Sequence, residues 1–197
     1  MKLLLGPPPN SLSDTQLTSG NWKPVTRLPM WAFQVMAPIA GGAIAFALFA
    51  AWAILTPRFT ISFAPSHQVI GAGFAVLLSG LAIQLAVHPS MGVSANSVVG
   101  FWPSRVTFYT AYLNGMSKRR CLLHMVSPLL VMCVVPLTVA AALRFTSGWL
   151  IFVSCLAAFI FGVNVLVAVR TMCQVPSGAT MRGRGFQSYW SVNGSEA

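Results

Sequence analysis

The chain contains long stretches of apolar residues, and these limit it to the folds that a lipid bilayer tolerates. Residues 31–55 carry no charged side chain, and at about 1.5 Å per residue a helix of that length crosses a hydrocarbon core of about 30 Å. Similar stretches cover residues 69–87, 121–143 and 149–169. Inside a bilayer, helices satisfy every backbone polar group within their own segment. We therefore predict an all-α membrane protein with four transmembrane helices.

Composition and charge agree with this class. Of the 197 residues, 56% are hydrophobic and only 7% are charged, whereas about a quarter of the residues of a soluble domain are charged. Twelve Lys and Arg stand against two acids, Asp14 and Glu196, which lie near the two ends of the chain. A nucleic-acid-binding protein would cluster its cations with aromatic residues, but here the cations are scattered at the ends of the spans. We expect the lipid bilayer as partner and no nucleic acid.

Three segments are expected outside the bilayer. Residues 1–30 are rich in Pro, Ser, Asn and Thr, which predicts a cytoplasmic, largely disordered arm before a transmembrane domain at 31–170. Residues 171–197 should form a cytoplasmic tail. Residues 89–120, between the second and third helices, mix Val, Phe and Tyr with Ser, Thr and Gly. We expect this long cytoplasmic loop to pack against the protein, with a short β-hairpin as one form it could take.

One face of the second predicted helix carries small and polar residues. Gly80, Gln84 and His88 are spaced four apart, so their side chains lie on the same face of a helix. A zinc peptidase places two histidines at this spacing, with a glutamate directly after the first as general base. Here Gly80 and Gln84 occupy the histidine positions and Leu81 occupies the glutamate position. Without the ligands, the simplest interpretation is a helix-packing face.

Several short motifs around this helix share their order and spacing with one protein family. They are His-Pro at 88–89, Ser-Val-Val-Gly-Phe-Trp at 97–102, Thr-Phe-Tyr at 107–109, Met-Ser-Lys-Arg-Arg at 116–120, Ser-Pro-Leu-Leu at 127–130, Val-Pro-Leu at 135–137, Gly-Val-Asn at 162–164 and Gln-Val-Pro-Ser-Gly-Ala at 174–179. Over residues 69–190 the chain resembles the zincin-peptidase-like family of bacterial membrane proteins, otherwise described as a domain of unknown function. The resemblance implies the fold of that family.

The resemblance also implies where a metal site would lie. Family members carry His-Glu-x-x-His in the helix and Gly-Gly-Asp in the last helix, whose aspartate would be a third ligand. Those four functional positions correspond to Gly80, Leu81, Gln84 and Asn164, and all four depart from the pattern. We therefore expect a catalytically inactive pseudopeptidase without a cofactor, in a binding or regulatory role, with another membrane protein as one candidate partner. We also expect Gln84 and Asn164 to face the bundle interior, close together.

Two other interpretations stay open. No carboxylate lies between residues 57 and 169, which excludes paired-acid catalysis and a proton relay built on Asp or Glu. His88, His124 and Cys121 are the remaining candidate ligands, and with them the chain would be an active membrane zinc metallopeptidase with atypical ligands. The third interpretation is a small structural or immunity-type membrane protein. Metal content separates the first two interpretations, and a co-purified partner would favour the third.

The distribution of cations predicts the topology. Ten of the twelve Lys and Arg lie in the arm, the long loop and the tail, and only Arg58 and Arg144 lie in the other two connections. Because cations stay on the cytoplasmic side, both termini should be cytoplasmic in a bacterial inner membrane. Reporter fusions after residues 27, 65, 114, 147 and 188 should read inside, outside, inside, outside and inside. An outside signal at residue 114 would contradict this topology.

Overall fold

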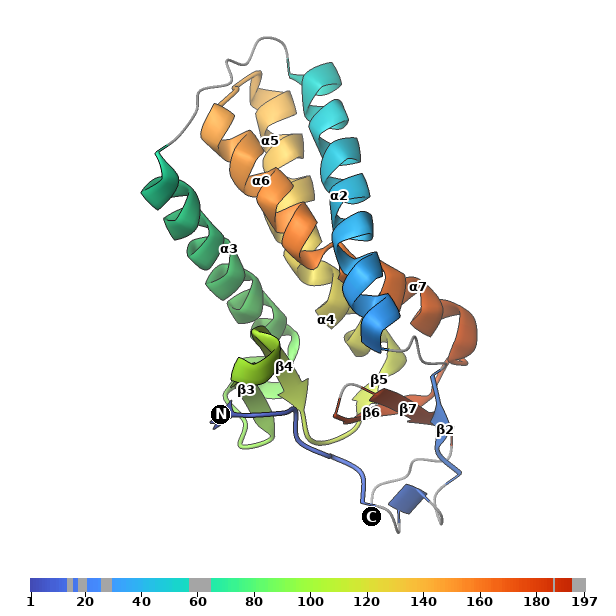
Figure 1. Ribbon diagram of the computed structural model, residues 1–197. Helices are drawn as coiled ribbons and strands as arrows, with labels where there is room; N and C mark the ends of the chain where they lie inside the picture. The colour runs from blue at the N-terminus through green and yellow to red at the C-terminus, as the bar shows by residue number, and fades with distance from the viewer. Residues whose placement is uncertain (14–15, 18–20, 26–29, 57–64, 186, 193–197) are drawn as a thin grey trace. The chain divides into compact units, whose positions relative to one another are not determined.

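The computed structural model describes residues 1–197 except 14–15, 18–20, 26–29, 57–64, 186 and 193–197. The chain forms two compact units, and both are discontinuous in sequence. A helical unit comprises Pro29–Ile83 and Val126–Leu166, and a mixed unit comprises Met1–Leu28, Gln84–Met125 and Val167–Ala197. The ends of three helices belong to the mixed unit, which also holds all the described strands (Figure 1).

The helices agree with the predicted spans in approximate position. They are α2 (Met30–Leu55), α3 (Ser66–Val87), α4 (Lys118–Leu129), the π-helical η3 (Leu130–Val134), α5 (Val135–Leu143), α6 (Gly148–Phe161) and α7 (Val163–Gln174). Three are long and apolar enough to cross a membrane: α2, α3 and the continuous stretch from α4 to α5. Helices α6 and α7 would make a fourth span, which is bent by 49°.

Two prolines disturb the third span, and the disturbance takes the form of a π-helical segment. Pro128 lies inside α4 and Pro136 in the first turn of α5, on either side of η3. A proline has no N–H to donate and its ring crowds the carbonyl one turn earlier. The wider π turn lets the helix continue past this point, as π segments do in other helices. The stretch from Lys118 to Leu143 therefore stays one continuous span in spite of its two prolines.

Small residues bring the helices of the helical unit into close contact. A Cβ atom at Gly41 of α2 would overlap the backbone oxygen of Phe159 in α6, so the two backbones touch there. At the break between α6 and α7, a Cβ atom on Gly162 would lie 2.8 Å from the Cα atom of Gly41. Such contacts without side chains are how helices associate in membranes, where burial of apolar surface supplies little driving force.

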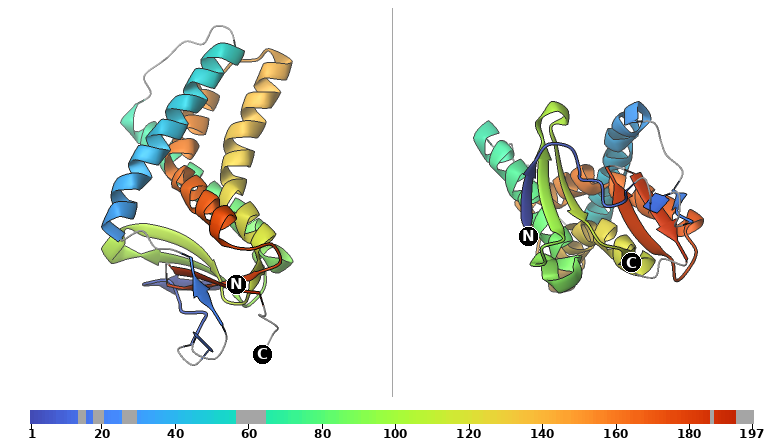
Figure 2. Two further views of the ribbon diagram at one scale, coloured as in Figure 1. Left: turned by 90° about the vertical axis from the view of Figure 1, so that its right-hand side faces the viewer. Right: turned by 90° about the horizontal axis from the view of Figure 1, so that it is seen from below.

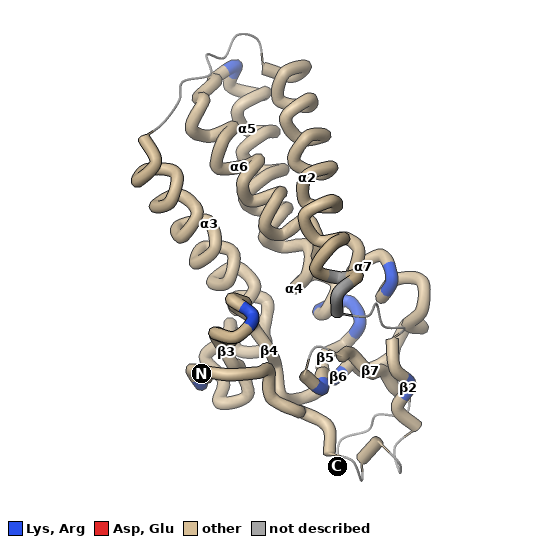
Figure 3. The backbone as a smooth tube through the Cα atoms, in the orientation of Figure 1, with Lys and Arg blue, Asp and Glu red and all other residues tan. Residues whose placement is uncertain are grey.

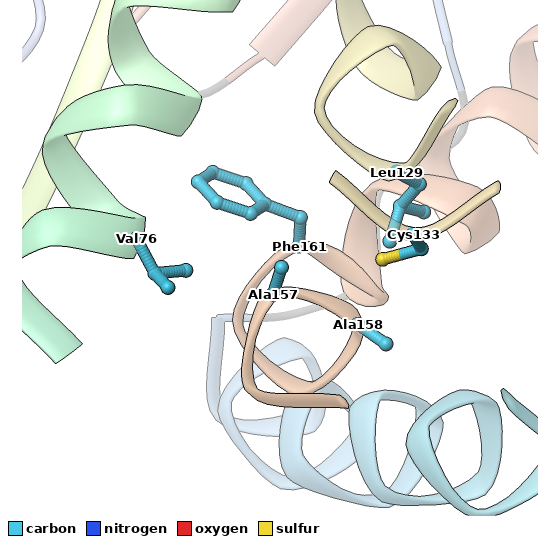
Figure 4. Close-up of a cluster of buried hydrophobic side chains, with 6 residues drawn as sticks. All are labelled: Val76, Leu129, Cys133, Ala157, Ala158 and Phe161. Carbon is cyan, nitrogen blue, oxygen red and sulfur yellow. The ribbon is translucent and has the colours of Figure 1, made fainter. Parts of the chain in front are cut away.

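A buried apolar cluster joins four elements of the helical unit. It consists of Val76, Leu129, Cys133, Ala157, Ala158 and Phe161. The ring of Phe161 projects from α6 towards α3, where Val76 lies (Figure 4). The Sγ atom of Cys133 donates a hydrogen bond to the backbone oxygen of Ser154, at 3.2 Å. This cysteine thus packs as a small buried residue of the cluster.

The mixed unit contains two β-sheets, which corrects the all-α expectation. The first has the order β1–β3–β4, with β1 (Lys2–Leu5) parallel to β3 (Ser97–Trp102) and β3 antiparallel to β4 (Thr107–Tyr112). The second has the order β2–β7–β6–β5, from Lys23–Pro24, Gln187–Ser191, Thr180–Arg184 and Met116–Ser117. Strands β3 and β4 are the expected hairpin, whereas the pairing of the two chain ends was not predicted.

The arm and the tail are parts of this unit and not separate segments. Where the structure describes residues 1–30, the arm pairs with the rest of the chain, which differs from the expected disorder. The amide of Ser11 donates to the carbonyl of Gly183 at 3.1 Å, and that of Val25 to the carbonyl of Ser188 at 2.9 Å. The two sheets lie beside each other, with β4 next to β6 (Figure 2). Strand pairing thereby satisfies backbone groups of the arm and the tail.

Candidate functional site

The predicted polar face of α3 is buried. Gly80, Leu81, Gln84 and His88 are all buried, while Ala82, on another side of the helix, is exposed. At Gly80 the space is taken by another side chain, because a Cβ atom there would overlap Cζ of Phe161. The position that would carry the first zinc ligand is therefore packed against an apolar ring, and an imidazole there would require that ring to move.

Gln84 is held by the hairpin and by α4. The hydroxyl of Thr110, on β4, lies 3.0 Å from Gln84 Oε1 and 3.3 Å from His124 Nε2. The other ring nitrogen of His124 lies 3.1 Å from the backbone oxygen of Gln84. One threonine hydroxyl thus links the last turn of α3 to α4, and the link needs no carboxylate.

These hydrogen bonds admit two arrangements of protons. A carbonyl oxygen only accepts, so Nδ1 of His124 donates to Gln84. If the ring is charged, Nε2 also donates to Thr110, and the threonine hydroxyl donates to Gln84 Oε1. If the ring is neutral, Thr110 donates to His124 Nε2, and Gln84 must turn its amide nitrogen towards Thr110. The orientation of the Gln84 amide is therefore linked to the charge of the His124 ring.

His88 lies directly after α3 and its ring stacks on that of His124, with centroids 4.8 Å apart and an interplanar angle of 27°. Nδ1 of His88 lies 3.3 Å from Ser97 Oγ, which in turn lies 3.2 Å from Ser94 Oγ. Nε2 is buried and has no hydrogen-bond partner among the described residues. Burial first, and then the charges of His124 and Arg120, lower the pKa of His88 to about 4. The ring is neutral at pH 7.

The pair of His88 and Ser97 has the residue types of a nucleophile and its base but not their properties. The lowered pKa makes the imidazole a weak base, and the serine is fully buried. A general base works best with a pKa near the operating pH. Two serines of the apolar spans, Ser79 and Ser127, are exposed and buried respectively. Neither lies in a nucleophile motif such as Gly-x-Ser-x-Gly. We therefore assign these serines to hydrogen bonding and packing.

The structure brings together only part of the alternative metal site. His88 and His124 are neighbours, but Cys121 belongs to a different cluster, with Val175 and Met181. Among the residues that the structure describes, no group of three His, Cys, Asp or Glu side chains is placed to hold a metal ion. A catalytic zinc needs three protein ligands, so the two histidines would need oxygen ligands from neutral side chains such as Thr110 or Gln84.

The residues that complete this cluster were missed in the sequence. Ser97, Thr110 and Tyr112 lie on the hairpin, and the ring of Tyr112 meets that of His88 edge-on, with centroids 5.6 Å apart. Their spacing on paired strands places them on one sheet face, because Ser97 is opposite Tyr112 and Val99 is opposite Thr110. Asn164 belongs to the helical unit and Gln84 to the mixed unit, so their predicted proximity stays a prediction.

The lowered pKa of His88 predicts a dependence of stability on pH. Above about pH 6.5 neither the folded nor the unfolded chain protonates this ring. Between pH 6.5 and about 4 the unfolded chain binds a proton that the folded chain does not, so stability falls as the pH falls. The shift from 6.5 to about 4 corresponds to a loss of at most about 3 kcal/mol. Thermal unfolding in detergent between pH 7.5 and 4.5 measures it.

Substitution by glutamine separates this ring from other titrating groups. His88→Gln should remove much of the loss of stability on acidification, while His67→Gln, which changes an exposed histidine, should leave it unchanged. A wild-type melting temperature that stays constant down to pH 4.5 would contradict the assignment. An equal slope in wild type and His88→Gln would contradict it too.

Comparisons with known proteins leave the function to be argued from these contacts. No protein-family model, curated protein or solved structure matches the chain.

Proposed function

We propose that this chain is a multi-pass protein of a bacterial inner membrane that uses a zincin-peptidase-like scaffold for binding or regulation and does not cleave peptide bonds. The observation that carries the proposal is the contact between Gly80 and Phe161. In the family that the sequence resembles, position 80 would hold a metal ligand. Here a Cβ atom at that position would overlap the Phe161 ring, so packing has replaced the ligand.

The environment of Gln84 supports the same proposal. A second zinc ligand would have to project from this position with a free nitrogen or oxygen atom. Instead the amide oxygen of Gln84 lies within hydrogen-bond distance of Thr110 and the side chain is 8% exposed. Leu81, at the position of the general base, is buried and apolar. The glutamate that acts as general base in zinc peptidases of the His-Glu-x-x-His type is therefore missing from this helix.

The distribution of charge supports the proposed membrane location. The described Lys and Arg of the mixed unit lie on its strands, in the turn between β3 and β4, in the first turn of α4 and within α7 (Figure 3). Lys118, at the start of α4, donates to the backbone oxygens of Met172 and Val175 at the end of α7. A cation at a helix C-terminus is favourable because it offsets the partial negative charge of the last carbonyls. We place this unit and both termini on the cytoplasmic side.

A second candidate is an active zinc peptidase with atypical ligands, favoured by the stacking of His88 on His124. Their two imidazole rings lie side by side, with centroids 4.8 Å apart. The candidate needs a third ligand and a general base, for which no described carboxylate is available. We therefore rank it below the pseudopeptidase. A third, the small structural or immunity-type protein, would be favoured by a co-purifying membrane partner.

Metal analysis distinguishes the first two candidates. We expect protein purified in detergent without chelators to contain much less than one zinc per chain. The positions that correspond to the three metal ligands of the family are occupied here by Gly80, Gln84 and Asn164. One zinc per chain, lost in both His88→Ala and His124→Ala but kept in Cys173→Ala, would establish the metallopeptidase instead. Cys173 is an exposed cysteine, so its replacement controls for adventitious binding to thiols.

A rebuilt site tests the resemblance directly. The variant Gly80→His, Leu81→Glu, Gln84→His and Asn164→Asp restores the family ligands, and Phe161→Ala in addition makes room at position 80. We expect stoichiometric zinc only when Phe161→Ala is included. A rebuilt protein that unfolds cooperatively and elutes as one species, yet binds no zinc in either form, would contradict the proposed scaffold.

A further inference from the structure

The two faces of the sheet β1–β3–β4 are covered differently. On one face Val98 is fully buried and Tyr109 is 7% exposed. The Tyr109 hydroxyl reaches the backbone oxygens of Gly6 and Pro7, at 3.1 and 3.2 Å, and its ring fills the space above Gly100. Residues 6 and 7, directly after β1, therefore cover this face at Tyr109.

The opposite face of the sheet contacts the C-terminal end of α3 and the N-terminal part of α4. Side chains alternate between the faces of a strand, so Ser97, Val99 and Phe101 share a face with their partners Tyr112, Thr110 and Phe108. Ser97 contacts His88 directly after α3, and Thr110 contacts Gln84 and His124. We call this the helix-side face, because the ends of α3 and α4 contact the sheet from this side.

The helix-side face continues beyond those contacts as an exposed apolar surface. Leu3 and Leu5 of β1 are opposite Val99 and Phe101, and they are 75% and 82% exposed. The rings of Phe101 and Phe108 stack beside them with centroids 4.5 Å apart. An apolar surface next to polar anchors usually marks a site of contact with a partner or a membrane.

The charges around this face match a bilayer surface. Arg105, in the hairpin turn, lies over the ring of Trp102 at 5.6 Å, and Lys118, Arg119 and Arg120 open α4. The mixed unit has no Asp or Glu among its described residues. Tryptophan and arginine are typical of the membrane–water interface, and each cation near anionic headgroups contributes about 1 kcal/mol of attraction. A surface that binds a protein partner more usually carries both positive and negative side chains.

We propose that the helix-side face of β1–β3–β4 lies in the interfacial layer of the bilayer, with Leu3, Leu5 and the pair Phe101–Phe108 against lipid. The inference rests on the proposed membrane insertion of α3 and α4. The ends of α3 and α4 would lie at the membrane surface, and they contact the helix-side face of the sheet. This face would therefore meet the same membrane surface. The N-terminal strand thus acts as an interfacial anchor, and the face covered by the arm is turned to water.

Site-directed fluorescence tests this orientation in the complete chain. Cys121, Cys133, Cys155 and Cys173 are replaced by alanine, and single cysteines are placed at Leu3, Leu5, Leu4 and Phe46. Leu4 is on the same strand but on the opposite face. Phe46 in α2 is 74% exposed and marks a span. Each protein is labelled with bimane and reconstituted into vesicles of phosphatidylcholine and phosphatidylglycerol. Quenching by doxyl groups on the acyl chains is compared with quenching by aqueous iodide.

We expect the doxyl lipids to quench labels at Leu3, Leu5 and Phe46, and iodide to quench the label at Leu4 most strongly. If the label at Phe46 escapes the doxyl lipids, the proposed membrane insertion fails. If Phe46 is quenched by lipid while iodide reaches residues 3 and 5 as readily as residue 4, the orientation of the sheet alone is wrong. Labels at 3 and 5 that are shielded from both quenchers would show a protein partner, which also overturns the inference.

Discussion

The absence of carboxylates from residues 57–169 governs how this protein satisfies its buried polar groups. An unpaired polar group in an apolar environment costs several kcal/mol, and the partners at hand in this part of the chain are neutral side chains and backbone groups. Thr110 serves Gln84 and His124, and Ser97 serves His88. Because these partners lie on the β3–β4 hairpin, the same hydrogen bonds that satisfy the helix ends also fix the hairpin on α3 and α4. The lack of carboxylates in the spans therefore goes together with a loop that packs as a hairpin against the helix ends.

Close packing of small residues has the second large effect. At Gly41 and Gly162 the absence of a side chain lets backbones touch, while at Gly80 it makes room for an aromatic ring. A helix that positions a metal needs side chains with donor atoms on that face, but a helix that packs needs none. On α3 the position in question is Gly80, which has no donor atom and packs against the ring of Phe161. The spacing that would serve a peptidase is thereby used to hold two helices together.

The sequence predicted the helices well because apolar stretches without charge have few alternatives in a membrane. The apolar helices, the hairpin and the buried face with Gly80, Gln84 and His88 could all be predicted from length and periodicity. The strands at the two chain ends could not, because β1 and β2 are 4 and 2 residues long and pair with segments far away in the sequence. Thr110 and Ser97 were missed for a related reason, since only the strand register places them beside His124 and His88.

A double-mutant cycle at Gly80 and Phe161 tests the central claim, that packing has replaced a ligand site. Phe161→Leu removes the Cε and Cζ atoms that a Cβ atom at position 80 would meet. In the wild type, Gly80→Ala should cost about 1–3 kcal/mol of stability, and much less in the Phe161→Leu background. Gly73→Ala on the same helix, where nothing lies within 4 Å of the new Cβ atom, should have a small effect in both. A cost of Gly80→Ala that is the same in both backgrounds would mean that the two residues do not touch, and would contradict the account.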